Sequence, residues 1–265
     1  MANTVTLSAN RMDAAPEVRR IAINDLKDAL REGYEDFSEM PTHAVFLCLI
    51  YPVIGLLVGM ASMGGRMAPL LFPLAAGFAI IGPFAAIGLY ELSRRREAGL
   101  PLSWRHGFDV VRSHNFVSML GVGLVLLVVF FGWLVAAQAI YTFSMGAEVD
   151  RVPNSLGEFL QRTLTTPEGW TMIVLGNIVG FLFACVALTI SVVSFPLLID
   201  RDVGAAVAIQ TSIRAVMKNP RVMAAWGLIV AAALLLGSIP LFVGLAVVVP
   251  ILGHATWRLY RKVVD

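Results

Sequence analysis

Four histidines and a few carboxylates are the side chains of this chain that could carry chemistry. The histidines are His43, His106, His114 and His254. No two of them share a helix face at the spacing that a metal ion or a haem group needs, so we expect no metal site and no cofactor. An enzyme acting on lipid would need Glu91, His106, His114 or Asp200 to converge in one cleft. This interpretation has the least support, and we expect no catalytic residues and no enzymatic activity.

Two uncharged polar side chains, Gln138 and Asn177, lie inside long apolar runs and are placed toward the outer leaflet. They could bond each other between neighbouring membrane helices, and we favour this packing role over a solute site. The apolar runs contain no Asp, Glu, Lys, Arg or His at mid-depth. Charges inside the membrane usually mark ion pathways, so their absence argues against an ion-coupled transporter. Cys48 and Cys185 also lie in apolar runs and are interpreted as packing residues.

The composition predicts an all-α, polytopic transmembrane helical bundle. The chain has 265 residues, of which 58% are hydrophobic and 14% are charged, whereas a soluble domain carries about 25% charge. A membrane helix needs about 20 apolar residues. The six predicted membrane helices cover about 44–62, 68–90, 116–140, 171–198, 222–237 and 239–257. The last two form a hairpin that breaks at Gly237–Pro240; a single kinked helix followed by a surface segment is the alternative.

The positions of the basic residues predict the orientation. In the six-helix arrangement, 17 of the 20 Lys and Arg residues fall on one side, and only Arg66, Arg151 and Arg162 fall on the other. The positive-inside rule then places both termini in the cytoplasm and residues 142–170 in the periplasm of a bacterial inner membrane. The chain thus divides into a cytoplasmic segment (1–43), a membrane domain (44–257) and a cytoplasmic tail (258–265). A net charge of +2 gives no indication of nucleic-acid binding.

Residues 24–40 of the first segment form a predicted amphipathic helix. Its apolar stripe includes Leu26, Leu30, Tyr34 and Phe37, and its acidic residues cluster on one flank. Anionic lipid would repel the acidic flank, so we predict that the stripe docks on the cytoplasmic ends of the bundle. The acids would then lie beside the basic cluster Arg94, Arg95 and Arg96 or face a basic partner. A solvated acidic face that merely covers the bundle is the simpler alternative.

A weak internal repeat is also visible. Pro83-Phe84 is followed by a charged stretch and by Trp104–Asn115, and Phe195-Pro196 is followed in the same way by Ala208–Asn219. Two predicted membrane helices separate the copies, so they would share one orientation as a parallel repeat.

Several sequence blocks resemble an uncharacterised family of predicted bacterial integral membrane proteins, a domain of unknown function with about six transmembrane helices. The blocks include Asp25-Leu26, Ala29-Leu30, Gly33, Asp36-Phe37, Pro41, Tyr51, Gly55, Gly82–Glu91, Ser93–Arg95, Pro101–Trp104, Pro250–Trp257 and Tyr260-Arg261. The resemblance implies a helical membrane fold and an inner-membrane location. It implies no activity and no catalytic residue.

These observations lead to two main hypotheses about function. The first is a non-enzymatic accessory or structural subunit, or an assembly factor, of a larger membrane complex, a respiratory complex being one candidate. Its partners would be the lipid bilayer and another membrane protein or a second copy of the chain. The second is a channel or transporter for a small or apolar solute. A polar path near Gln138 and Asn177 would favour transport, whereas a dry packed core would favour the scaffold.

Overall fold

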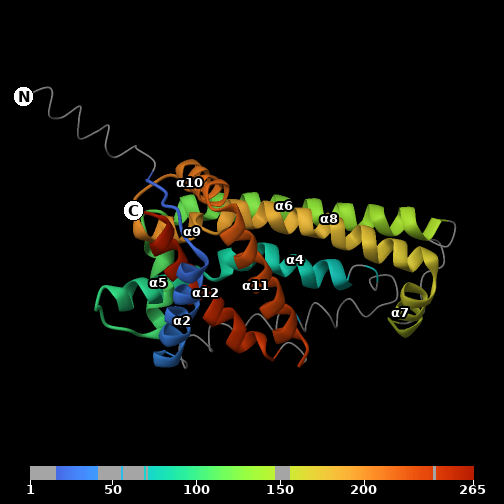
Figure 1. Cartoon of the computed structure of the whole chain (residues 1–265), viewed down its shortest axis with the longest axis horizontal. Helices are drawn as coiled ribbons and strands as arrows, with labels where there is room; N and C mark the ends of the chain where they lie inside the picture. The colour runs from blue at the N-terminus through green and yellow to red at the C-terminus, as the bar shows by residue number, and fades with distance from the viewer. Residues whose placement is uncertain (1–15, 41–54, 56–68, 70, 147–155, 241–242) are drawn as a thin grey trace, which may run out of the picture.

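The computed structural model of the protein describes residues 16–40, 55, 69, 71–146, 156–240 and 243–265 (Figure 1). Within these ranges the chain is all-α, with an isolated antiparallel bridge between Val18 and Val264. The helices in chain order are α2 (Ile23–Glu39), α4 (Leu71–Ala85), α5 (Ile87–Glu97), the 3-10 helix η2 (Trp104–Arg112), α6 (Phe116–Met145), α7 (Leu156–Thr165), α8 (Pro167–Ser191), α9 (Ser194–Asp200), α10 (Ala205–Lys218), α11 (Pro220–Ser238) and α12 (Leu245–Val263).

In the described part of the chain, four helical stretches are long and apolar enough to cross a membrane. They are Phe72–Glu97, Phe116–Met145, Pro167–Asp200 and Pro220–Ser238. The first joins α4 to α5 and the third joins α8 to α9. These stretches coincide with the predicted helices at 68–90, 116–140, 171–198 and 222–237. The predicted helix at 44–62 lies outside the described residues except for Gly55, so the structure does not show six membrane helices.

The second half of the predicted hairpin, 239–257, differs from the expectation. A helix is present, α12, but it is not among the four membrane-spanning candidates. The second half of α12 is buried within the protein, where Trp257, Leu259 and Tyr260 are each 1% exposed. This half also carries basic side chains, whose partners are carboxylates of α2, α5 and α9. The second half of α12 therefore packs against other helices of the protein, whereas the hydropathy pattern predicted contact with lipid.

Helices α4, α6 and α8 run side by side along the long axis of the molecule, while α2, α5, α9, α10 and α12 gather at one end and α7 lies at the other (Figure 1). The first group is mostly apolar, whereas the second carries many acidic and basic residues, and we call its end of the molecule the charged end. Most of the largest fully buried side chains belong to the charged end, and the others belong to α6 and α11. The full set is Trp226, Trp257, Tyr260, Phe195, Leu26, Leu89, Leu92, Met119, Leu126, Leu197, Leu198 and Met223. The packed core therefore fixes the charged end of the molecule.

One face of α6 is exposed along much of its length. Its exposed apolar side chains recur every three or four residues, at Val117, Leu120, Leu124, Val128, Phe131 and Val135. This spacing places them on one stripe of a helix. The opposite side of α6 packs on α4 and α8 through apolar residues that include Val122, Leu126 and Trp133. The Trp133 indole donates its Nε1 hydrogen to the carbonyl oxygen of Pro73, 2.8 Å away, so its one polar atom is satisfied.

The internal repeat is not visible as a pair of equivalent elements. The stretch of the first copy is the 3-10 helix η2, whereas Ala208–Asn219 of the second copy belongs mostly to the α-helix α10. One parallel remains, because Asn115 and Asn219 each precede the helix that follows and bond to backbone carbonyls with their side-chain amides.

Candidate functional site: a buried polar centre

Five polar side chains from three helices meet inside the charged end. Asp36 comes from the last turn of α2, Ser93 and Arg96 from α5, and His254 and Arg258 from α12. Ser93 and Arg96 are three residues apart, and His254 and Arg258 are four apart, so each pair shares one helix face. We call these five residues the polar centre. Asp36, Ser93 and His254 have no exposed surface at all.

Close helix contact brings the polar centre together. A Cβ added to Gly33 of α2 would lie 2.5 Å from the backbone nitrogen of Ala255 in α12 and 2.6 Å from its Cα. A Cβ on Gly253 would lie 2.6 Å from Cδ1 of Leu89 in α5. Only glycine leaves room at such distances, because a side chain at either position would push backbone or core atoms apart.

Asp36 is the acceptor at the middle of the polar centre. Its Oδ1 accepts from Nη2 of Arg258 at 2.7 Å, and its Oδ2 accepts from Nε of Arg258 at 2.9 Å. Nη1 of Arg96 also donates to Oδ1, and the Ser93 hydroxyl donates to Oδ2 at 3.1 Å. A buried carboxylate is tolerated only when it is paired and hydrogen-bonded, and Asp36 meets both conditions.

Ser93 connects the carboxylate to the histidine. Its Oγ lies 2.6 Å from Nδ1 of His254. A hydroxyl has one proton, and since Ser93 donates it to Asp36, the hydrogen between Ser93 and His254 must come from Nδ1. The neutral imidazole then carries a lone pair on Nε2, which is buried and has no hydrogen-bond partner among the described residues. The direction of donation thus runs from His254 through Ser93 to Asp36.

Burial keeps His254 neutral. Desolvation lowers the pKa of His254 from 6.5 to about 4, against the attraction of the Asp36 carboxylate and with a smaller contribution from Arg258 and Arg96. The side chain is therefore uncharged at neutral pH. It could accept a proton only through Nε2, which no solvent reaches.

The polar centre combines Ser, His and Asp, but its order differs from that of a hydrolytic triad. In a triad the carboxylate accepts from the histidine, and the histidine accepts from the serine. Here the carboxylate accepts from the serine and two arginines, and the histidine donates to the serine. The serine oxygen is also completely buried, so it cannot reach a substrate. This arrangement joins α2, α5 and α12 rather than activating a nucleophile.

Peripheral ion pairs surround the polar centre. Nζ of Lys262 lies 2.9 Å from Oε1 of Glu32, which ties α12 to α2 a second time. Glu97 at the end of α5 accepts from Nε1 of Trp257 at 2.9 Å and from Nε of Arg261 at 3.0 Å. The Tyr260 hydroxyl donates to Oδ2 of Asp200 at 2.6 Å, and burial together with this bond raises the pKa of Tyr260. Together these contacts fix α12 to α2, α5 and α9.

The three arginines of the basic cluster, Arg94, Arg95 and Arg96, pair with different carboxylates. Arg94 donates to Glu91 at 2.7 and 2.8 Å, and Arg95 lies 3.5 Å from Asp109. Arg96 reaches back to α2, where it contacts both Asp36 and Glu39. The cluster is thus an internal part of the charged end, and Arg96 is the member that contacts the N-terminal helix.

Three of the four predicted docking residues of α2 face the protein. Leu26 is 2% exposed, and Leu30 and Phe37 are half-buried against the core. Tyr34 is 59% exposed, so its predicted place in the docking stripe is wrong. At about 100° per residue, the buried face is centred on Gly33, and Tyr34 falls at its edge. Asp36, one of the acidic residues predicted to cluster on one flank of the helix, lies instead on the buried face, where it pairs with two arginines.

Gln138 and Asn177 do not bond each other in the structure. Both side chains are exposed on the surface of the bundle, and Nδ2 of Asn177 donates to the carbonyl oxygen of Ile173 in its own helix at 2.8 Å. Two of the residues that the lipid-enzyme hypothesis required form contacts with other side chains. Glu91 pairs with Arg94, and Asp200 pairs with Tyr260.

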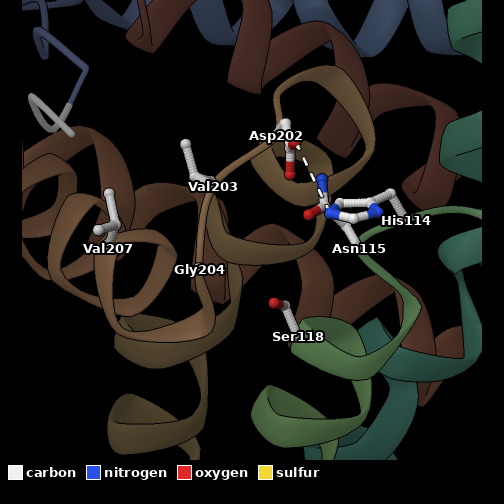
Figure 2. A pocket seen from close by; sticks show the side chains of 7 residues that line it. All are labelled: His114, Asn115, Ser118, Asp202, Val203, Gly204 and Val207. Carbon is white, nitrogen blue, oxygen red and sulfur yellow. Dashed lines mark ion pairs between the residues drawn. The ribbon is translucent and has the colours of Figure 1, made fainter. Parts of the chain in front are cut away.

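His114 belongs to a separate surface pocket between the start of α6 and the start of α10 (Figure 2). The pocket is lined by His114, Asn115, Ser118, Asp202, Val203, Gly204 and Val207. Nε2 of His114 lies 4.0 Å from Oδ2 of Asp202, and both side chains are largely exposed. Asn115, one of the lining residues, donates through Nδ2 to the carbonyl oxygens of Leu198 and Arg201. Such a solvated contact is weak and positions no reactive group.

Comparison with protein-family models relates the chain to a family of membrane proteins. A family model described as a predicted integral membrane protein (DUF2189) matches residues 71–200, from α4 through α9. Searches of curated proteins and of solved structures gave no match. The matched region contains Ser93 and Arg96 of the polar centre, whereas Asp36, His254 and Arg258 lie outside it.

Proposed function

We propose that this chain, which belongs to the DUF2189 family of predicted integral membrane proteins, is a non-enzymatic scaffold: an accessory subunit or assembly factor of a larger membrane complex. Respiratory complexes are among the candidates. The protein is a multi-pass integral membrane protein, and its spans contact the lipid bilayer. The proposal of a scaffold role is based on the contacts that its polar side chains make.

One observation carries the proposal: the side chains that could do chemistry are used to join helices. Asp36, Ser93 and His254 have no exposed surface, and each belongs to a different helix. A buried and paired polar centre favours one arrangement of the charged end and offers nothing to a substrate. A rigid charged end that presents a fixed surface is what a subunit or assembly factor requires.

The contact between the membrane helices gives no support to the alternative, a channel or transporter. Where α6 meets α4 and α8, the buried side chains are apolar and include Val122, Leu126 and Trp133. Gln138 and Asn177, which would have to line a polar path, are exposed on the outside of the described bundle. This dry interior is the feature that distinguishes a scaffold from a solute pathway.

We further propose that the charged end faces the cytoplasm of a bacterial inner membrane. The described basic residues of α2, α5, η2, α10 and α12 lie at this end, and only Arg162 of α7 lies at the other (Figure 1). This distribution supports the orientation expected from the positive-inside rule, with both termini in the cytoplasm.

Co-purification from the native membrane tests the scaffold. Tagged wild-type chain, Gly82→Ala and Gly33→Ala are extracted in mild detergent, and bound proteins are identified by mass spectrometry. A scaffold keeps the same stoichiometric partner in the wild type and in Gly82→Ala, because no described atom lies within 4 Å of the added Cβ. It loses the partner in Gly33→Ala, in which α2 is forced away from α12.

Two results contradict the proposal. One is a wild-type chain that carries no stoichiometric partner from the native membrane. The other is solute uptake by vesicles that contain only the purified chain, which would instead establish the transporter. Monodisperse elution of both variants in detergent serves as the control for folding.

A further inference from the structure

The 3-10 helix η2 leaves a row of apolar side chains uncovered at the charged end. Three residues complete one turn of a 3-10 helix, so its side chains fall into three rows. One row, with Gly107 and Val110, is buried against α5, whereas Phe108 and Val111 of the next row are 49% and 58% exposed. Other exposed apolar side chains of the same segment are Leu100, Leu102 and Trp104. We call residues 100–112 the η2 segment.

The η2 segment lies beside a membrane span. A Cβ on Gly88 of α5 would be 3.0 Å from the carbonyl oxygen of Gly107, so the two backbones touch. Gly88 lies within the span Phe72–Glu97, less than one turn before Glu91, the first acidic or basic side chain of that span. The contact therefore places η2 at the depth where the hydrocarbon layer gives way to lipid headgroups.

The charges on the η2 segment fit a negative surface. The Arg105 guanidinium lies over the Trp104 ring, 5.6 Å from its centre. Among the described residues, neither Arg105 nor Arg112 forms an ion pair with a carboxylate, whereas Asp109 is paired with Arg95 at 3.5 Å. Both free guanidinium groups thus lie next to exposed apolar side chains. Exposed aromatic and aliphatic groups flanked by arginines are the composition of segments that bind in the membrane interface.

We propose that the η2 segment is a lipid-binding surface for anionic phospholipids. Phe108 and Val111 insert beside the acyl chains of the leaflet that surrounds α5, and Arg105 and Arg112 bind the headgroup phosphates. Arginine suits this role because its planar guanidinium donates two parallel hydrogen bonds to a phosphate. The site is distinct from the scaffold function, since it concerns how the charged end is held against the bilayer.

Depth-dependent quenching in lipid nanodiscs tests the proposal on the full chain. An environment-sensitive fluorophore is attached at Phe108→Cys in a background with Cys48→Ser and Cys185→Ser. Matched probes are placed at Leu124→Cys, on the exposed stripe of α6, and at Lys27→Cys, on the exposed side of α2. The nanodiscs contain acyl-brominated lipid with or without phosphatidylglycerol. We expect quenching at position 108 to lie between the two references and to be stronger with phosphatidylglycerol.

The arginines are tested in the same probe background. In Arg105→Gln/Arg112→Gln, quenching at position 108 should lose its dependence on phosphatidylglycerol, while quenching at position 124 stays the same and shows that the fold is intact. Quenching at position 108 no greater than at position 27 would overturn the proposal. A probe at position 108 shielded from both brominated lipid and a soluble quencher would also overturn it, because protein would then cover the segment. An unchanged response in the double arginine variant would rule out anionic lipid as the ligand.

Discussion

The Asp36 carboxylate and the Arg258 guanidinium meet at two points, with Oδ1 2.7 Å from Nη2 and Oδ2 2.9 Å from Nε, across 222 residues of sequence. The pair joins the N-terminal helix to the last helix of the chain. Asp36 has no exposed surface, so solvent cannot replace its partners. Most of the behaviour that we expect of the charged end follows from this contact.

Removing the Asp36 carboxylate should destabilise the protein strongly. Asp36→Ala leaves two arginines without their shared acceptor, and breaking a buried ion pair in this way costs about 3–5 kcal/mol of the free energy of unfolding. Asp28→Ala is the matched control, because Asp28 contacts Arg31 at 3.2 Å on the exposed side of α2. The control should lose less than about 1 kcal/mol. Denaturation in mild detergent measures both, and equal losses would show that Asp36 does not hold α2.

The protein should become less stable as the pH is lowered, because the pKa of His254 is lower in the folded than in the unfolded state. The folded-state pKa is about 4 against an ordinary value of 6.5, so the folded protein binds the proton more weakly than the unfolded chain does. Neutral His254 therefore contributes about 3 kcal/mol to the free energy of unfolding above about pH 6.5, and this contribution is lost progressively as the pH falls toward 4. The groups that face the ring are Asp36 of α2, Ser93 and Arg96 of α5, and Arg258 of α12.

The comparison for this prediction is His254→Asn, whose amide can still donate to Ser93 but does not titrate. Denaturation of both proteins is followed from pH 7 to pH 4.5. The wild type should lose more stability than the variant over this range, because the carboxylates titrate in both. Parallel curves would show that burial of His254 is not linked to folding.

An added methyl group at Gly33 should displace α2. The Cβ of Gly33→Ala would overlap backbone atoms of Ala255, which cannot rotate away as a side chain could. Overpacking of this kind costs about 1–3 kcal/mol. Gly82→Ala in α4 is the control, because no described atom lies within 4 Å of its added Cβ. Limited proteolysis should cut Gly33→Ala near α2 faster than wild type or Gly82→Ala, and equal rates would disprove close packing.

Replacing Gln138 or Asn177 by Leu should have little effect. Both side chains are exposed on the bundle surface, and Asn177 bonds only within its own helix among the described residues. We expect a change below about 0.5 kcal/mol in the free energy of unfolding. Trp133→Phe provides the contrast, because it removes the buried bond to Pro73 and should cost about 1 kcal/mol. A large loss in either Leu variant would point to a partner or solute at that position.

Reporter fusions test the orientation of the chain in the membrane. A fusion at residue 155 should give a periplasmic signal and a fusion at the C terminus a cytoplasmic one, because the basic residues gather at the end that holds the C terminus. A periplasmic signal from the C-terminal fusion would reverse the orientation. It would also place the charged end on the wrong side for the positive-inside rule.

The amino-acid sequence is sufficient to predict α2 and the long apolar helices, because their signals are local. Periodicity predicted a helix at 24–40, and α2 spans Ile23–Glu39. Apolar length predicted 116–140 and 171–198, and the structure has spans at Phe116–Met145 and Pro167–Asp200. The membrane class, the family resemblance and the split of basic residues likewise depend only on composition and order along the chain.

Which polar residues become buried and paired depends on the tertiary structure. Asp36 is one of eight acids in the first 43 residues, and nothing local distinguishes it until Arg96 and Arg258 pack on it. One sequence feature did indicate that Asp36 is buried, because it falls at helical spacing with Leu26, Ala29 and Gly33. The surroundings of α12 also depend on distant residues. Hydropathy predicted a membrane helix, but α2 and α5 bury its second half. Burial and pairing depend on groups far apart in sequence, so they are set only when the chain folds.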